Sequence, residues 1–254
     1  MHLSLKKNTN STKQEHMDKD SKSSLLAGID VEGIIKKSIR NDVPRAKKLD
    51  ESYVAEPKTY RQVSEFVSQK TKDAHVALYQ DYVQTLNRVS AELDGADTSE
   101  ANSKHSSYRS LKLDETFNLN SVWLHELFFA GSFDPHSEVY MDSSAYIELE
   151  RSWGTFDDWQ KDFLACAMSS GQGWAVCGYN MFLKKFVNTQ VSNHSQDVML
   201  GLYPLIVLDM HEHSYFRDYL GDKKSYAVAL MRQIDWNVIE ERFNKAKAFI
   251  QVLK

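Results

Sequence analysis

The chain has little cysteine: only two thiols, Cys166 and Cys177, stand among its 254 residues. Both lie in apolar segments, "FLACAM" and "GWAVCGY", where free cysteine behaves as a small buried apolar residue. This favours two buried thiols over a disulfide framework of the kind that small secreted domains use. Two buried thiols indicate a reducing compartment, so we expect a cytoplasmic protein or a component of a larger particle.

Long apolar runs and a strong excess of charge are also missing. No segment reaches the roughly 18 apolar residues that a membrane-spanning helix needs. Residues 1–20 carry acids without an apolar centre, unlike a secretory signal. The 35 acidic and 31 basic side chains give a net charge of −4. We therefore expect no direct binding to nucleic acid or to an anionic membrane.

Residues 1–56 contain few aromatic side chains and are rich in Lys, Ser, Asn and Asp. Such a composition can bury little surface, so we expect a flexible N-terminal extension. A short helix is predicted within it over residues 25–39. The extension is either a disordered tail or an arm that contacts another protein.

From Pro57 onward, apolar residues recur at helical spacing. The segment 59–93 places them three and four positions apart, which predicts long amphipathic helix. Ser68 is a candidate N-cap for a second helix after a bend. Residues 94–108 are a polar loop, and a second apolar helix is predicted over 119–133, ending near Gly131.

In the next part of the chain the spacing of apolar residues changes from helical to strand-like and back. Two helices are predicted within 143–171, separated at Gly154. Helix is predicted again over 223–249. Between them lie three β-branched and aromatic segments, 173–182, 184–192 and 202–208. Their short, regular spacing favours an antiparallel three-stranded meander, and the whole order indicates an α+β fold in two parts.

Ionisable side chains follow the last predicted strand, in the run "LDMHEH". Asp209 and His213 are four positions apart, so on a helical turn they share a face, whereas His211 would point elsewhere. A carboxylate and an imidazole that converge form half of a transition-metal site. Such pairs also arise by chance, so this interpretation depends on partners elsewhere in the chain.

Two histidines in apolar helical segments supply such partners: His75 in "KDAHVALY" and His125 in "VWLHELFF". A lone histidine on an apolar face is usually a core residue. Two of them, together with an Asp/His pair, form a candidate metal-binding set. The remaining histidines lie in polar stretches and are expected at the surface: His2, His16, His105, His136 and His194.

Six motifs, in order along the chain, resemble the iron/manganese superoxide dismutase family. "VSQKTKDAHVALYQDYVQTLN" is similar to the family's first ligand helix and "VWLHELFF" to its second. "WGTFDDWQKDF", "GQGWAV", "LDMHEHSYFRDY" and "IDWNVIEERF" follow in the family's order. The resemblance implies a helical hairpin domain, residues 57–133, then an α/β domain with a three-stranded antiparallel sheet, residues 134–254.

The resemblance also implies an activity and a site. The activity is metal-dependent dismutation of superoxide. One iron or manganese ion per chain would be bound by a water and by four side chains: His75, His125, Asp209 and His213. Tyr82 matches the family's gateway tyrosine beside the metal. Glu212 matches a glutamate that reaches the ligand histidine of a partner chain, which implies a homodimer. Otherwise Tyr82 is a core aromatic and Glu212 a solvated charge.

The chain departs from the family's pattern close to the metal. Ser121 and Ser170 stand where the family carries the glutamine that binds the metal's water, and His211 replaces a tryptophan. His75 precedes Tyr82 by seven positions instead of eight, and one residue turns a helix by about 100°. Because losing such an outer partner lowers activity, we expect the dismutation to be weak.

Two other functions fit parts of the sequence. A non-catalytic structural protein with this fold, built into a virus particle or an organellar ribosome, would explain the long extension and the altered surroundings of the metal. A zinc hydrolase would use the same ligand types, but the chain has no HExxH helix. Metal content together with a superoxide assay distinguishes these functions.

Overall fold

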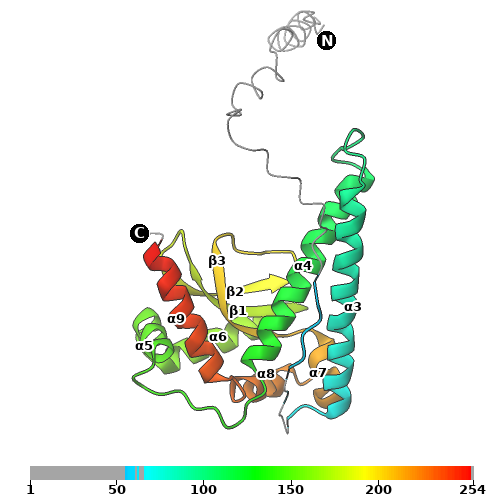
Figure 1. Cartoon of the computed structure of the whole chain (residues 1–254). Helices are drawn as coiled ribbons and strands as arrows, with labels where there is room; N and C mark the ends of the chain where they lie inside the picture. Colours follow the sequence, from blue (N-terminus) through cyan, green and yellow to red (C-terminus); the bar gives the residue numbers. More distant parts are fainter. Residues whose placement is uncertain (1–54, 61, 63–65, 253–254) are drawn as a thin grey trace, which may run out of the picture. The chain divides into compact units, whose positions relative to one another are not determined.

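The computed structural model of the chain describes residues 55–60, 62 and 66–252 (Figure 1). The predicted extension over residues 1–56, with its helix over 25–39, lies outside the described residues except for Ala55 and Glu56. The described residues belong to one compact unit, Glu51–Lys254.

Two long helices form a hairpin: α3 (Gln69–Asp94) and α4 (Ser107–Gly131). The hydroxyl of Ser68 accepts a hydrogen bond from the backbone N–H of Thr71 and so caps α3, as predicted. Ser106 caps α4 in the same way. This cap starts α4 well before the predicted position, while its end at Gly131 agrees with the prediction.

The predicted helix over 59–93 is wrong in its first part. Residues 55–60 and 62 are not helical. Ala55 exchanges two hydrogen bonds with the side chain of Asn87, and the backbone N–H of Lys58 donates to the Tyr79 hydroxyl. Side chains of α3 thus hold the segment just before the predicted helix, and within the predicted range Lys72 of α3 donates to the backbone carbonyl of Gln62.

Two shorter helices follow, α5 (Ser144–Trp153) and α6 (Phe156–Ser169). They are separated at Gly154, as predicted, where the backbone has a φ of 92° that favours glycine. Thr155 then caps α6 by accepting from the backbone N–H of Asp158.

The sheet contains β1 (Gly173–Asn180), β2 (Lys185–Ser192) and β3 (Leu202–Asp209), all antiparallel. Its order is β2-β1-β3, so the predicted meander is wrong, because a meander would place β2 in the middle. β1 is buried along its whole length, whereas β2 is mostly half-buried. The most fully buried strand therefore takes the centre, and the partly exposed β2 takes an edge.

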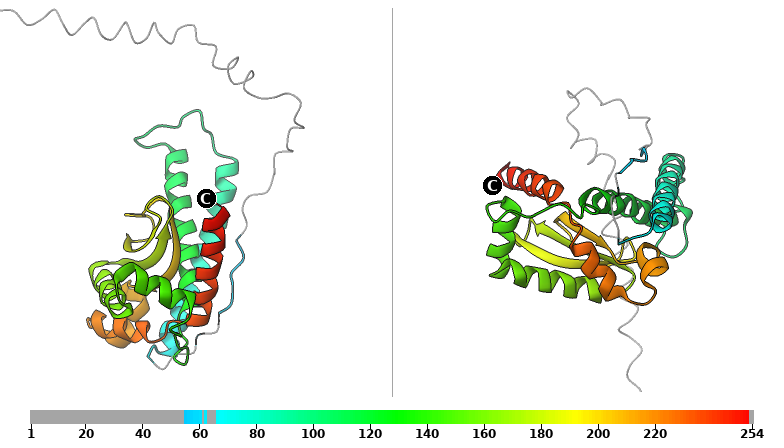
Figure 2. Two further views of the ribbon diagram at one scale, coloured as in Figure 1. Left: turned by 90° about the vertical axis from the view of Figure 1, so that its left-hand side faces the viewer. Right: turned by 90° about the horizontal axis from the view of Figure 1, so that it is seen from below.

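Three helices complete the chain: α7 (Glu212–Tyr219), α8 (Lys223–Met231) and α9 (Trp236–Val252). Figure 2 shows α4 and α9 on one face of the sheet and α6 on the other. The α+β fold with a helical hairpin and a three-stranded antiparallel sheet is confirmed. Within the described ranges, no helix is long and apolar enough to cross a membrane.

A half-buried arginine joins the hairpin to the sheet. Arg242 of α9 donates through Nη1 to the carbonyl of Leu205 in β3 and through Nη2 to the carbonyl of Leu127 in α4, both at 2.8 Å. Burial lowers the pKa of Arg242 to about 10, which still leaves it charged at neutral pH. The guanidinium of Arg242 thus bonds both to the helix that carries His125 and to the strand that ends at Asp209.

Candidate metal centre

Four side chains from four different elements converge at one point. His75 comes from α3, His125 from α4, Asp209 from the end of β3 and His213 from the first turn of α7. Their candidate ligand atoms all lie within 4.8 Å of one another. His75 joins the set although its spacing from Tyr82 is one residue shorter than in the family's common pattern.

Asp209 is the centre of the cluster and is fully buried. Its Oδ2 lies 2.9 Å from Nε2 of His75, 3.0 Å from Nε2 of His213 and 3.7 Å from Nε2 of His125. Burial opposes its ionisation, but His213 and His211 outweigh burial, so the pKa of Asp209 lies well below its usual range. The carboxylate is therefore charged at neutral pH.

The local backbone aims this carboxylate into the cluster. The main-chain carbonyl of Asp209 accepts hydrogen bonds from the hydroxyls of Ser214 and Tyr226. Asp209 ends β3 and His213 lies in the first turn of α7. The prediction that the two share one helical turn is therefore wrong. They meet because only Met210 and His211, with a bend at His211, separate the end of β3 from the start of α7.

His125 is wholly buried, and its two ring nitrogens differ. Nδ1 lies 2.6 Å from the carbonyl oxygen of Ser121, which can only accept, so Nδ1 carries the proton. The pKa of His125 lies well below its ordinary value because burial and then His75 disfavour a charged ring. Nε2 therefore holds a lone pair and has no partner in the described part of the chain.

Two unprotonated acceptors thus face each other, Nε2 of His125 and Oδ2 of Asp209. Oδ2 has the rings of His75 and His213 within hydrogen-bond distance, but the buried lone pair of His125 Nε2 has no donor among the described residues, which is unfavourable unless a cation lies near it. Three imidazole nitrogens and one carboxylate oxygen are a ligand set typical of a transition metal. The residues present therefore fit a bound metal ion.

Tyr82 lies beside this cluster, with its ring centroid 5.5 Å from that of His125. Its hydroxyl is 3.1 Å from Nε2 of His194. Burial, followed by the charges of Asp209 and Asp81, raises the pKa of Tyr82. The phenol therefore keeps its proton at neutral pH.

His194 was expected at the surface, and that expectation is wrong: only 3% of the residue is exposed. The indole N–H of Trp174 donates to its Nδ1 at 3.0 Å. Nδ1 is thus an acceptor, so the ring's proton sits on Nε2 and is donated to the oxygen of Tyr82. The polar run around His194 gave no sign of this burial, which depends on contacts with distant residues.

His211 was expected to point away from Asp209, and this is also wrong. Its Nδ1 lies 2.8 Å from Oδ1 of Asp209, and its backbone N–H donates to the same oxygen at 2.9 Å. The predicted direction assumed a helix through this segment. In the strand-to-turn geometry that the chain adopts, the ring folds back onto the carboxylate.

The two serines that stand at expected glutamine positions do not face the cluster. The Ser121 hydroxyl donates to the carbonyl of Phe117 and the Ser170 hydroxyl to that of Ala167, each within the residue's own helical segment. The polar side chain beside Tyr82 is instead that of His194.

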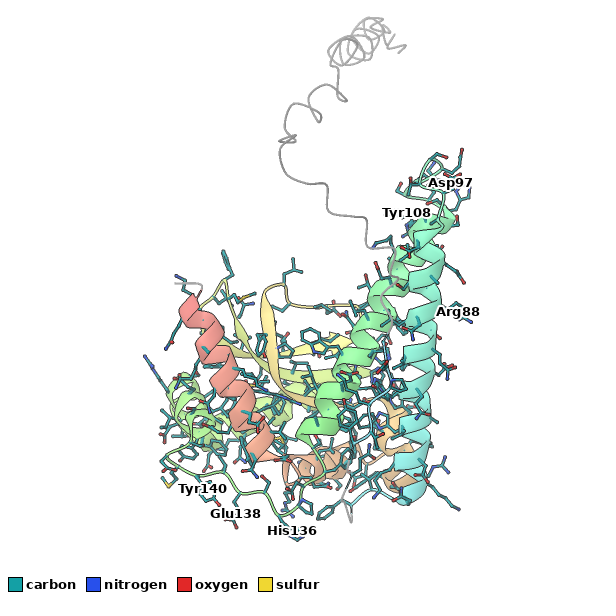
Figure 3. The ribbon with its side chains drawn as sticks, viewed as in Figure 1. Arg88, Asp97, Tyr108, His136, Glu138 and Tyr140 are labelled. Atoms are coloured by element: carbon teal, nitrogen blue, oxygen red, sulfur yellow. The ribbon has the colours of Figure 1, made fainter. Side chains whose placement is uncertain are left out.

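The other predicted residues lie apart from the cluster. The side chain of Glu212 is exposed on the first turn of α7. His105 and His136 are exposed as expected, and Figure 3 shows His136 on the outward loop between α4 and α5. His2 and His16 lie outside the described residues.

Known proteins resemble this chain in sequence. The model for "iron/manganese superoxide dismutases, C-terminal domain" matches residues 142–242. A superoxide dismutase [Fe] of Aquifex pyrophilus is 36% identical over 181 residues, which cover 70% of this chain and 84% of the relative. A superoxide dismutase [Mn] of Halobacterium salinarum is 32% identical over 52% of this chain and 66% of its own length. A chloroplastic superoxide dismutase [Fe] of Oryza sativa is 28% identical over 74% of each chain.

The chain belongs to the iron/manganese superoxide dismutase family. The predicted family and enzyme class are thereby confirmed. The matches extend over most of the length of an iron-dependent relative, so the alternative of a non-catalytic structural protein is not favoured.

Proposed function

We propose that the chain is a superoxide dismutase that converts two superoxide ions and two protons into dioxygen and hydrogen peroxide. One iron or manganese ion per chain would be held by His75, His125, Asp209 and His213. When bound, the metal relays one electron from the first superoxide to the second. The observation that carries this proposal is the pair of facing acceptors, Nε2 of His125 and Oδ2 of Asp209, 3.7 Å apart.

Tyr82 would supply a proton as peroxide forms. Its hydroxyl oxygen already accepts from Nε2–H of His194, so its own O–H is free to donate toward the substrate. Trp174 fixes this direction, because its indole N–H can only donate. Trp174, His194 and Tyr82 thus form one oriented chain of hydrogen bonds that ends beside His125.

In this proposal the dismutation rate depends more on His194 than on Ser121 or Ser170. The weak activity expected from the sequence assumed that an amide at one of these serine positions was needed. Both hydroxyls are engaged with carbonyls of their own segments, whereas His194 places an N–H beside Tyr82. We propose that His194 takes the orienting role in this chain.

A homodimer would complete the site. Glu212 is exposed and precedes the proposed ligand His213, and in such a dimer it would reach a ligand histidine of the second copy. Phe216 and Leu220, at either end of the last turn of α7, are 50% and 64% exposed, and Phe66, whose carbonyl accepts from the Tyr219 hydroxyl of α7, is 40% exposed. Sedimentation at micromolar concentration tests this: a dimer that Glu212→Ala weakens supports it, and a monomer contradicts it.

The remaining assignments are proposals of the same kind. Residues 57–133 and 134–254 would act as two domains with the metal between them. Cys166 and Cys177 are free thiols, which supports a cytoplasmic location or a place within a larger particle. Residues 1–56 would contact another protein rather than nucleic acid or a membrane.

The experiment that tests the activity loads the metal-free, full-length protein with iron, manganese or zinc in parallel. Zinc fills the same ligands but does not change oxidation state. We expect dismutation with iron or manganese, or with both, and none with zinc. Equal rates for the three loaded forms, or a hydrolase activity that appears only with zinc, would refute the proposal.

A further inference from the structure

The two oxygens of Asp209 serve different partners. Oδ2 faces the three histidines of the candidate metal centre. Oδ1 accepts from two donors, and both belong to His211: the backbone N–H and the ring Nδ1. One residue therefore occupies the oxygen that the proposed metal does not use.

The His211 ring has a defined proton position. A carboxylate can only accept, so the proton of a neutral ring lies on Nδ1, between the ring and Asp209. Nε2 is buried and has no hydrogen-bond partner among the described residues. An unpaired buried nitrogen destabilises a fold, so packing alone does not account for a histidine here.

Helix capping does not account for it either. His211 is the N-cap residue of α7, a position that favours Ser, Thr, Asp or Asn. Its side chain makes no capping hydrogen bond within the described chain. The ring turns away from the helix it begins and toward Asp209.

Ring stacking holds His211 in this orientation. Its ring stacks on that of His213 at 4.9 Å with planes 14° apart, and on that of His194 at 4.7 Å with planes 25° apart. Trp174 meets the same ring edge-on at 5.4 Å. Since three aromatic neighbours fix the ring plane, Nδ1 is directed at Oδ1 at little further cost in rotamer entropy.

We propose that His211 is a positioning residue that fixes Asp209 through Oδ1 and so sets the affinity and the reduction potential of the metal held at Oδ2. This inference rests on the proposed function. A hydrogen bond to one oxygen of a ligating carboxylate withdraws electron density from the other. A less electron-rich ligand favours the +2 over the +3 state, so His211 raises the reduction potential.

The test compares two variants of the full-length protein. His211→Phe keeps a stacking ring but removes the N–H. His211→Asn keeps an N–H at the position of Nδ1, because the amide nitrogen is the same number of bonds from Cβ. Exposed His105→Phe is the matched control. Metal affinity is measured by chelator competition, and the midpoint potential by redox titration of the iron-loaded protein.

We expect His211→Phe to bind metal about 10–100-fold more weakly and to shift the midpoint potential to a more negative value. His211→Asn should restore both quantities toward the wild type. A His211→Phe protein with unchanged affinity and potential would overturn the inference. Failure of the proposed function looks different, since the wild-type protein itself would then bind no iron or manganese or show no dismutation.

A measurement on the wild type removes the dependence on a folded variant. In the zinc-loaded, diamagnetic protein, the ¹⁵N shifts of the imidazoles report which nitrogen carries the proton. We expect His211 to be the Nδ1–H tautomer, with a proton signal typical of a hydrogen bond to a carboxylate. An Nε2–H tautomer at His211 would overturn the inference.

Discussion

Nε2 of His125 lies 3.7 Å from Oδ2 of Asp209, and neither atom carries a proton to share with the other. The buried Nε2 of His125 has no hydrogen-bond partner among the described residues, and such an unpaired polar atom destabilises the metal-free protein. A bound cation removes that cost and adds ligand bonds, so folding and metal binding are coupled.

Metal removal should therefore lower the melting temperature. At a free metal concentration of about 100 times the Kd, binding adds about 2.7 kcal/mol to the free energy of unfolding. Calorimetry of chelator-treated and reloaded protein measures this difference. His125→Ala should abolish the effect, and exposed His136→Ala should leave it unchanged. Equal melting temperatures with and without metal would contradict the proposed centre.

Tyr82→Phe should slow dismutation by about 10–100-fold because peroxide formation loses a proton donor, while metal content stays the same. The raised pKa of Tyr82 also predicts a pH dependence. The donor form is the protonated phenol, so wild-type activity should persist above pH 10 and fall only as the pH passes the raised pKa. Exposed Tyr140→Phe is the control, and an unchanged rate in Tyr82→Phe would argue against the role.

The effect of replacing His194 on the dismutation rate should depend on the hydrogen bonds that the new side chain makes and not on its size. In His194→Gln the amide oxygen can accept from Trp174 and the amide nitrogen can donate to Tyr82, so activity should stay within a few-fold of wild type. His194→Leu fills a similar space without either bond and should lose about 10–100-fold. Steady-state rates per bound metal decide this, and equal rates for the two variants would be inconsistent with an orienting role.

Arg242→Met should weaken the link between the hairpin and the sheet. It removes two hydrogen bonds from a charged donor, each contributing about 1.5–3 kcal/mol, and leaves the carbonyls of Leu205 and Leu127 without that partner. We expect the free energy of unfolding, measured in urea, to fall by about 3 kcal/mol and the metal affinity to fall with it. Exposed Lys245→Met should change neither. Lost stability with unchanged metal affinity would show that Arg242 does not position the ligands.

Much of the fold was predictable because its signals are local. Gly154 separates α5 from α6, Ser68 caps α3, and the three strands follow from runs of β-branched residues. Strand order was not predictable in this way. It depends on which strand is buried on both sides, and that is decided by α4, α9 and α6 packing around β1 and its neighbours.

The site shows the same contrast between signals that are local in sequence and contacts that are not. His75, His125, Asp209 and His213 could be found from apolar surroundings, chain order and resemblance to a family. His194 and His211 could not. The first is buried by residues distant in sequence, among them Trp174 and Tyr82. The second depends on a strand that ends at Asp209, so that the His211 ring folds back onto the carboxylate.

The most direct test of the account measures initial dismutation rate against bound iron or manganese, in preparations of the full-length protein with graded metal content. If His75, His125, Asp209 and His213 hold the reactive metal, the rate should rise in proportion to occupancy and extrapolate to zero for the metal-free protein. Full occupancy at about one ion per chain, with no rate above that of the free metal, would contradict it.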